Sequence, residues 1–384
     1  MGRYGGDFAA RPDDAEDVSP AAKAARAVAL FPPGFLPPPD LIAADGRRDR
    51  CRFSVHGRGG GADAASRPLT LEFAEAGVLA PLAAPAHHLA SDRVNALLPL
   101  IVDSCDARPP LRDRLRSIHV HAPRDRAAEP VVALIYEGPA ADAAAWTVAA
   151  DALREAVAAA GETVHLRGRF KGATLLSGDR DFVHETLTLE DGRRLRYEQP
   201  EGSFSHPNGS ANERSVSWLC ARAATVPAPA NLLELYCGNG NHTAALAARF
   251  ARVVAVEVDA KLVAAARRNL AANGATNATV LVDAVGKSRL VRSVLRRAAW
   301  TDRDAGEAVA FDCVLVDPPR CGLDADTLNQ LAHFRHVLVV SCNPSALAQQ
   351  APTLAATHDV AACCMCDGFP GTPHVECLLH LVRR

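Results

Sequence analysis

The feature that most constrains the fold is a strict alternation of short apolar runs and helical patterns after about residue 213. The expected strands are 232–235, 253–257, 279–282, 311–316 and 336–341. The helical patterns that follow them are 243–250, 260–272, 288–299, 325–333 and 344–354. Alternation of this kind predicts a doubly wound, Rossmann-like α/β fold with a parallel sheet. Two last apolar runs, 360–366 and 376–382, have no helix between them, so we expect an antiparallel pair at one side of the sheet.

Composition divides the rest of the chain. Residues 1–45 are rich in Ala, Pro and acidic residues, and two proline runs break any helix, so we expect a disordered or poorly structured leader. Residues 46–198 mix β-like runs with two helical stretches, which is typical of an α+β domain on an antiparallel sheet. A glycine-rich stretch at 57–61 predicts a flexible hairpin tip within it. Residues 199–384 would then form the α/β domain.

Several protein classes are excluded. With 384 residues the chain has room for two domains, and no apolar run approaches the roughly 18 residues of a membrane span. The first twenty residues are acidic and have no apolar centre, unlike a secretory signal or transit peptide. The eleven cysteines are odd in number and scattered, which indicates reduced thiols. We therefore expect a protein of the cytoplasm or an unidentified organelle, neither secreted nor in a membrane.

Cysteine placement also bears on metals. Cys363, Cys364 and Cys366 lie in an apolar run without a second ligand pair at zinc-like spacing, so we expect buried strand residues. Only Cys51 and Cys105 precede Cys220, which is too few for an iron–sulfur cluster in the front half of the chain. No metal is expected.

Charge gives a weak indication of a nucleic-acid partner. The formal net charge of −2 does not favour one, and arginine runs are most often solvated surface. Local clusters are nevertheless able to contact phosphates, because a guanidinium binds them bidentately. These clusters contain Arg47, Arg48, Arg50 and Arg52, then Arg108, Arg112, Arg114, Arg116, Arg124 and Arg126.

A glycine-bearing turn indicates a nucleoside cofactor. Gly238 and Gly240 lie where the first α/β strand ends and a helix begins, so a ligand can approach the backbone. Glu257, 19 residues beyond Gly238, ends the next strand, where an acid accepts hydrogen bonds from ribose hydroxyls. The third glycine of a pyrophosphate-binding turn is absent, which favours S-adenosylmethionine over NAD. Asp283 either receives the adenine amino group or caps a helix.

Three polar residues should meet at the carboxyl edge of the sheet. Asp317 follows the fourth strand and Cys342 follows the fifth. Glu376 begins the last strand, which starts at the same edge if it is antiparallel. Ligands of open α/β sheets bind at this edge. The topology therefore predicts a shared site for a thiol and two carboxyls.

This combination suits covalent methylation of a pyrimidine. A Cys342 thiolate can add to C6 of uracil and make C5 nucleophilic towards a sulfonium methyl group. Glu376 is the candidate base for the C5 proton. Because Pro344 indicates a helix start, we expect the helix N-terminus to lower the pKa of Cys342.

At these residues the chain resembles the tRNA (uracil-5-)-methyltransferase family, from about Ala25 to Arg384. The motifs that carry the resemblance are Phe204-Ser205-His206-Pro207-Asn208, Glu234 to Asn241, Ala255-Val256-Glu257, Val316 to Gly322, Ser341 to Pro344, and Phe369 to Cys377. The resemblance implies Cys342 as nucleophile and Glu376 as proton acceptor. It implies cofactor contacts from Tyr236, Asn241, Glu257 and Asp317, in addition to the Gly238 backbone indicated by the turn. It also implies tRNA as partner and 5-methyluridine in the T loop, at position 54, as product.

The chain departs from the family at two residues. His206 replaces a glutamine that contacts the cofactor, and His242 replaces an aromatic residue. A histidine still makes one hydrogen bond, so we expect His206 to remain a cofactor contact. Phe204 either stacks near the extruded base or packs in the core, and Arg320 is a candidate substrate contact.

Alternative functions remain open at this point. The same chemistry on an rRNA or tmRNA uridine is one, although rRNA relatives often carry an iron–sulfur cluster or an extra β-barrel that this chain cannot accommodate. An RNA-binding or tRNA-folding factor with secondary methylation is another. An amino-methyltransferase, which needs no thiolate, is a third. We expect a monomer.

Overall fold

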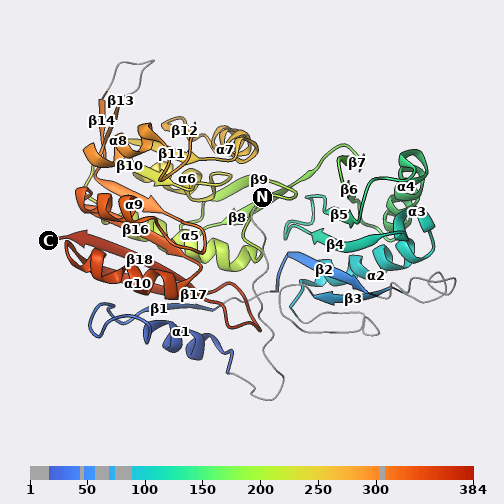
Figure 1. The fold of residues 1–384 in the computed structure, drawn as a ribbon, viewed down its shortest axis with the longest axis horizontal. Coiled ribbons are helices and arrows are strands. Elements are labelled where there is room, and N and C mark those ends of the chain that lie inside the picture. The colour runs from blue at the N-terminus through green and yellow to red at the C-terminus, as the bar shows by residue number, and fades with distance from the viewer. Residues whose placement is uncertain (1–16, 44–46, 57–68, 74–88, 302–307) are drawn as a thin grey trace. The chain divides into compact units, whose positions relative to one another are not determined.

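The computed structural model describes residues 17–43, 47–56, 69–73, 89–301 and 308–384 (Figure 1). Contacts divide the chain into two compact units. One consists of Met1–Asp17 and Arg47–Val183, and the other of Val18–Gly46 and His184–Arg384. The glycine-rich stretch at 57–61 lies outside the described residues.

The second unit is built on an eight-stranded sheet with the order β1-β17-β18-β16-β15-β10-β11-β12. Its strands are β1 (Asp40–Ala43), β10 (Asn231–Leu235), β11 (Arg252–Glu257), β12 (Ala278–Val282), β15 (Cys313–Val316), β16 (His336–Ser341), β17 (His358–Asp367) and β18 (Glu376–Arg383). The neighbours from β16 to β12 are parallel, whereas β18 is inserted antiparallel between β16 and β17. The predicted doubly wound α/β fold and its antiparallel last pair are confirmed.

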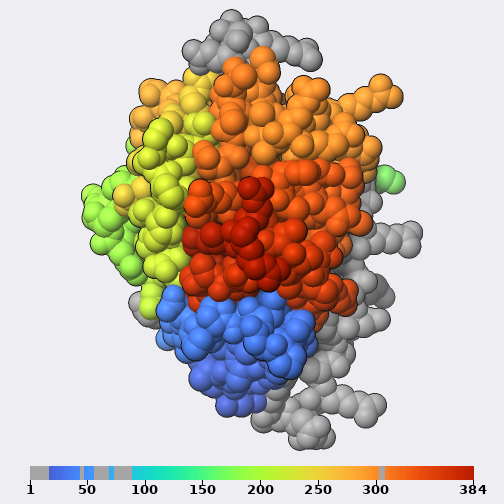
Figure 2. Space-filling view, turned by 90° about the vertical axis from the view of Figure 1, so that its left-hand side faces the viewer, coloured from blue at the N-terminus to red at the C-terminus, as the bar shows by residue number. Residues whose placement is uncertain are grey.

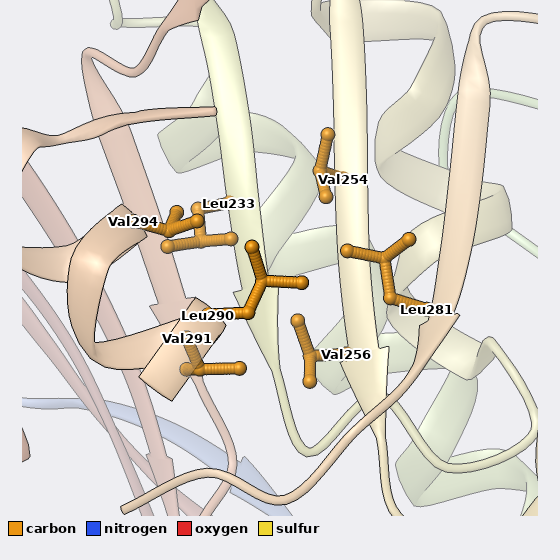
Figure 3. A pocket seen from close by; sticks show the side chains of 7 residues that line it. All are labelled: Leu233, Val254, Val256, Leu281, Leu290, Val291 and Val294. Carbon is orange, nitrogen blue, oxygen red and sulfur yellow. The ribbon is translucent and has the colours of Figure 1, made fainter. Parts of the chain in front are cut away.

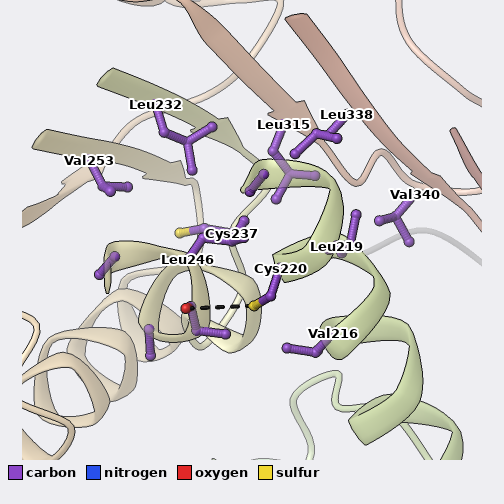
Figure 4. Close-up of a cluster of buried hydrophobic side chains, with 14 of the residues drawn as sticks. Val216, Leu219, Cys220, Leu232, Cys237, Leu246, Val253, Leu315, Leu338 and Val340 are labelled. Carbon is purple, nitrogen blue, oxygen red and sulfur yellow. Dashed lines mark hydrogen bonds between the residues drawn. The ribbon is translucent and has the colours of Figure 1, made fainter. Parts of the chain in front are cut away.

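Helices cover both faces of this sheet. The helical elements are α1 (Pro20–Val28), α5 (Gly209–Ala223), α6 (Asn241–Leu246), η2 (Ala247–Arg249), α7 (Ala260–Ala272), α8 (Arg289–Arg297), α9 (Ala325–Gln330), η3 (Leu331–His333) and α10 (Pro344–Ala355). Side chains of α5, α6 and α7 pack on one face, and those of α1, α8, α9 and α10 pack on the other. Figure 4 shows the first face, where Leu219 and Leu246 lie near Leu232 and Leu315 of the strands.

The buried cysteines belong to these packed layers. Cys363, Cys364 and Cys366 on β17 are each no more than 2% exposed, which confirms the prediction of buried strand residues. On α5 the Cys220 thiol donates a weak hydrogen bond to the Ala245 carbonyl at 3.7 Å, drawn as a dashed line in Figure 4. Thiols in such surroundings act as small apolar side chains.

The structure corrects the expectation of a poorly structured leader at 1–45. Residues 1–16 lie outside the described part, but α1 is capped by Ser19, and β1 pairs in parallel with β17. The proline runs lie between these two elements. In Figure 2 the blue segment that contains α1 lies directly against the red C-terminal residues. The buried Lys23 ammonium, which pairs with Asp367 at 2.8 Å, fixes α1 there.

The boundary between the two units lies earlier than the expected one at 198/199. The reason is a hairpin of β8 (Phe182–Thr188) and β9 (Arg194–Pro200). The contact division falls at 183/184 instead. β9 packs on α7, where Glu198 pairs with Arg268 and its backbone N–H donates to Asn269. These contacts tie the hairpin to the α/β unit. A further short hairpin joins β13 (Ala299–Thr301) to β14 (Ala308–Ala310).

The first unit holds a six-stranded sheet, in the order β3-β2-β4-β5-β6-β7. Its elements are β2 (Arg50–His56), β3 (Thr70–Phe73), α2 (Asp92–Asp106), α3 (Pro109–Arg112), β4 (Leu115–His121), β5 (Val131–Tyr136), α4 (Ala143–Ala159), β6 (His165–Phe170) and β7 (Ala173–Ser177). Residues such as Phe53 and Ile118 pack with α2 and α4 on one face. The β5–β6 pair is parallel because α4 forms a crossover between them, so the sheet is mixed rather than wholly antiparallel.

Candidate active site

Three strand ends bring the predicted reactive residues to one edge of the second unit. β16 and β18 are antiparallel neighbours in which Ser341 lies opposite Cys377. Cys342 directly follows β16, and Glu376 is the first residue of β18. β15 is the parallel neighbour of β16 on its other side, and Asp317 directly follows it. The charges of Glu376 and Asp317 both act on the Cys342 thiol.

The environment of Cys342 differs from the expected activated thiol. Burial first, and then the charges of Glu376 and Asp317, raise the pKa of Cys342 to about 11. The prediction that the α10 N-terminus lowers this pKa is wrong. Cys342 precedes the N-cap residue Asn343, whose own side chain takes the Ala346 N–H. The dipole effect, confined to the first turn, is therefore outweighed by burial and like charge.

Glu376 is nine-tenths buried and has a histidine partner. Nε2 of His206 lies 3.2 Å from Oε2 of Glu376, and the two side chains are 10% and 9% exposed. Nδ1 of the same ring accepts the Asn208 backbone N–H at 3.2 Å. Burial lowers the pKa of His206, but the Glu376 carboxylate and these hydrogen bonds outweigh burial and raise it. Both ring nitrogens are thus engaged by the protein.

Two acidic side chains lie near His242. Its Nδ1 lies 4.0 Å from Oε1 of Glu234 and 4.0 Å from Oδ2 of Asp317. Burial lowers the pKa of His242 to about 4, so the ring is neutral at physiological pH. Burial also raises the pKa of Asp317 and that of Glu234 to about 8. Both carboxyls therefore hold protons at neutral pH in the free protein.

The glycine turn after β10 forms an open cradle. Tyr236 has a left-handed φ of 65°, and Gly238 has a φ of 57° with no atom within 4 Å of the position of a Cβ. A side chain at Gly238 would project into this open space. Glu257 ends β11 beside the turn and accepts the Gly238 N–H at 3.1 Å. Its other oxygen accepts the backbone N–H groups of Val258 and Asp259.

The remaining predicted residues lie around this rim. Asn241 begins α6, and its side-chain amide exchanges two hydrogen bonds with the Asn212 amide. Phe204 is 70% exposed, so the core-packing alternative for it is wrong. Arg320 is exposed, and its carbonyl accepts from the Asn343 amide. The helix-cap alternative for Asp283 is also wrong, because Ser288 caps α8 and donates its hydroxyl to Asp283.

Sequence reasoning missed Glu234, Val258 and Val282. The Glu234 carboxylate is 1% exposed, and neither oxygen has a hydrogen-bond partner among the described residues. A charge within the apolar run of β10 was the available signal. Val258 and Val282 are 64% and 51% exposed, and Val282 lies opposite Glu257 in the ladder. Exposed valines at strand ends offer an apolar surface beside the acid that ends β11.

A hollow elsewhere in the unit is not this site. It is lined by seven apolar residues of α8, β10, β11 and β12, and Figure 3 shows Leu290 and Val291 of α8 directed at the strands. It has no reactive group. Within the described ranges, no three His, Cys, Asp or Glu side chains are arranged to hold a metal ion. In the same part of the chain, no helix is both long and apolar enough to cross a bilayer.

The fold and the site together define a class of protein. A doubly wound sheet with an antiparallel strand inserted near one edge, an open glycine turn and an acid ending the next strand are the features of an S-adenosylmethionine-dependent methyltransferase. The family model for tRNA (uracil-5-)-methyltransferase matches residues 75–384, and the chain belongs to that family.

Individual relatives agree with this assignment. The chain is 36% identical over 371 residues to a tRNA/tmRNA (uracil-C(5))-methyltransferase of Ectopseudomonas mendocina, covering 96% of this chain and 97% of the relative. It is 39% identical over 297 residues to the protein of that name from Pseudomonas paraeruginosa, covering 77% and 78%. The crystal structure of Pyrococcus abyssi tRNA (uracil-54, C5)-methyltransferase with S-adenosyl-L-homocysteine has the same fold, with a TM-score of 0.61, 19% identity, and coverage of 94% of this chain and 82% of that one.

Proposed function

We propose that the chain methylates C5 of a uridine in the T loop of tRNA, position 54, through a covalent bond between Cys342 and C6 of the base. The observation that carries the proposal is the meeting of Cys342 and Glu376 at the ends of two hydrogen-bonded strands, with Asp317 on the next strand. This places a nucleophile and a base on the same rim as the glycine cradle, as covalent C5 chemistry requires.

The chain's own residues account for the bond changes. The Cys342 thiol releases its proton to solvent, its sulfur adds to C6 as the thiolate, and the electron pair of the C5–C6 double bond moves towards C5 and the C4 carbonyl. S-adenosylmethionine, when bound, supplies a methyl group to C5 from its sulfonium. Glu376 then takes the C5 proton, the C5–C6 double bond re-forms, and the Cys342 thiolate leaves. Sulfur is neither oxidised nor reduced over the cycle, and the methylated base is released.

The cradle fits the cofactor. Glu257 would hold the ribose hydroxyls, because its carboxylate ends β11 beside the open Gly238 backbone. The exposed Val258 and Val282 would flank the adenine ring. Tyr236, Asn241 and Asp317 would line the path from there to the reactive edge. The buried Glu234 carboxyl, whose oxygens have no hydrogen-bond partner among the described residues, would accept a hydrogen bond from the cofactor's ammonium group.

RNA binding would use exposed cations of the first unit. Several arginines of the predicted clusters are buried or already paired with acidic residues of that unit. Arg48 is buried, Arg47 pairs with Asp92, Arg112 with Asp106 and Arg126 with Glu162. Among the described residues, Arg52, Arg114 and Arg116 are exposed and have no ion-pair partner. A folded T loop hides its uracil, so the base must be extruded, and the exposed Phe204 offers it a stacking surface.

A second candidate substrate is tmRNA, because the similar relatives carry both tRNA and tmRNA in their names. Its uridine would need to lie in a loop of the same shape. Specificity for one RNA or the other would then depend on contacts outside the base pocket.

The test is a product map. The protein is incubated with methyl-labelled S-adenosylmethionine and an unmodified tRNA transcript, and the RNA is digested to nucleosides. We expect label in 5-methyluridine at position 54 and no label when a cytidine replaces that uridine. Label in an exocyclic methylamine would support the amino-methyltransferase alternative, and the absence of label with intact tRNA binding would support the folding factor.

A further inference from the structure

His206 occupies a position where the resemblance implies a cofactor contact, yet its hydrogen bonds are made within the protein. Its Nε2 lies 3.2 Å from Oε2 of Glu376, and its Nδ1 lies 3.2 Å from the backbone nitrogen of Asn208. A neutral imidazole has one donor and one acceptor nitrogen. Both are used, so no ring nitrogen remains for a ligand.

The Asn208 contact fixes the tautomer. A backbone N–H can only donate, so Nδ1 of His206 must be the acceptor. In the neutral ring the proton then resides on Nε2, which donates it to Oε2 of Glu376. Asn208 is itself held as the N-cap of α5, where its side chain accepts the Ala211 N–H. The start of α5 thus fixes the Asn208 N–H, and this N–H in turn sets the direction of the His206–Glu376 hydrogen bond.

Packing holds the ring in this orientation. A Cβ added to Gly368 would lie 2.8 Å from Cε1 of His206, so only glycine fits beside the ring. Phe369 is on the same loop as Gly368, and its ring centroid lies 5.9 Å from that of His206. The side chain of His206 is 10% exposed, which leaves it little freedom to turn towards another partner.

We propose that His206 is a positioning residue for Glu376 rather than a cofactor contact. Its Nε2–H holds Oε2 of the carboxylate, so that Oε1 faces the C5 proton. Among the described residues, His206 provides the one hydrogen bond to this carboxylate. The proposal rests on the function proposed above, because it assigns His206 to the proton-abstraction step of that reaction.

The reaction sequence gives this role a distinct signature. Proton abstraction comes after methyl transfer and before the Cys342–C6 bond breaks. An enzyme with a misplaced base stalls at that point and retains a covalent RNA adduct that already carries the new methyl group. An enzyme with a weakened cofactor site forms less of that adduct.

The experiment compares His206→Ala and His206→Gln with the unaltered protein. For His206→Ala we expect kcat to fall by about 10- to 100-fold, because a small misplacement of a catalytic group has an effect of this size. The dissociation constant of S-adenosylmethionine, measured by calorimetry, should stay within about threefold. A denaturation-resistant adduct that contains labelled methyl should accumulate. His206→Gln, whose amide can donate the same bond, should recover most of kcat. His333→Ala, which alters an exposed histidine of η3, is the matched control and should leave kcat unchanged.

Two results would overturn the proposal. One is a weaker dissociation constant for S-adenosylmethionine with kcat retained at saturation, which is the behaviour of a cofactor contact. The other is a lower kcat without a methylated adduct in both variants. Failure of the underlying function would look different, because the unaltered protein would then form no adduct even with 5-fluorouridine RNA.

Discussion

Single residues at the site are tuned by burial more than by the helix beside them. The thiol of Cys342 has a pKa of about 11 because it is partly buried and faces Glu376 and Asp317. A thiol reacts as its thiolate, and with this pKa the Cys342 thiol stays protonated at neutral pH in the free enzyme. Addition of the sulfur to the base therefore requires that the bound substrates lower the pKa of Cys342. A resting thiol of this kind is also protected from oxidation.

This environment predicts slow alkylation of Cys342. At pH 8 we expect iodoacetamide to modify Cys342 more slowly than the exposed Cys321, measured by mass spectrometry of the two peptides. The rate at Cys342 should rise tenfold per pH unit up to pH 9 and beyond, because the thiolate fraction does. Glu376→Gln removes one of the charges that raise the pKa of Cys342 and should speed the reaction. Faster modification of Cys342 than of Cys321 in the unaltered protein would contradict this description.

The sequence was sufficient to place the candidate reactive residues at one edge of the sheet but not to describe their surroundings. Asp317, Cys342 and Glu376 could be placed at one edge because strand order and direction follow from the alternation of elements. The pairing of His206 with Glu376 joins residues 170 apart, and no local pattern encodes it. The direction of the pKa shift at Cys342 could not be predicted either, since burial depends on the whole fold.

At the scale of elements, α1 helps to hold the loop that precedes Glu376. The Lys23 ammonium lies 2.8 Å from Oδ1 of Asp367 and donates to the Phe369 carbonyl at 2.9 Å. The side chains of Lys23 and Asp367 are 0% and 3% exposed. This loop also carries Gly368, which packs against His206. The helix near the start of the chain thus supports the reactive edge.

Breaking this buried pair should be costly. Lys23→Met leaves the Asp367 charge buried without its partner, and we expect a loss of about 3–5 kcal/mol in the free energy of unfolding. Urea denaturation followed by circular dichroism measures the loss. The double variant Lys23→Met/Asp367→Asn removes both charges and should recover part of it. Equal stability of the Lys23→Met and unaltered proteins would show that the pair does not hold α1.

Local composition explains why this element was missed. The Ala- and Pro-rich stretch has the character of a disordered segment, but β1 pairs with β17 more than 300 residues away and Trp218 donates to Asp40. Such long-range contacts are absent from any window of sequence. The strands and helices of the α/β unit were predictable because each carries its own apolar period.

For the whole molecule, the chain forms two compact units, and the function proposed above assigns the chemistry to the second and RNA binding to the first. The α/β class could be predicted from the alternating pattern. The mixed sheet of the first unit could not, because pairing of β5 with β6 depends on the path of α4. Net charge was uninformative, since many arginines of the clusters are used internally.

RNA affinity should depend on salt through a few exposed arginines. We expect Arg52→Ala and Arg116→Ala each to reduce the slope of log K against log salt concentration by about 1, because each removes one phosphate contact. Filter binding of a tRNA transcript over a salt series measures the slope. Arg126→Ala is the control, since Arg126 already pairs with Glu162 and should change the slope less. An unaltered slope in both test variants would exclude these arginines from the RNA interface.

The central claim is that sulfur of residue 342 bonds to the base, and trapping that bond tests it most directly. A tRNA transcript with 5-fluorouridine at position 54 has no C5 proton to lose, so the enzyme cannot complete the cycle. After incubation with S-adenosylmethionine, the account predicts a denaturation-resistant protein–RNA adduct whose nucleotide maps to the Cys342 peptide. Loss of the adduct in Cys342→Ala, with Cys321→Ala as a normal control, completes the prediction. Methylated product without an adduct, or an adduct on another cysteine, would contradict it.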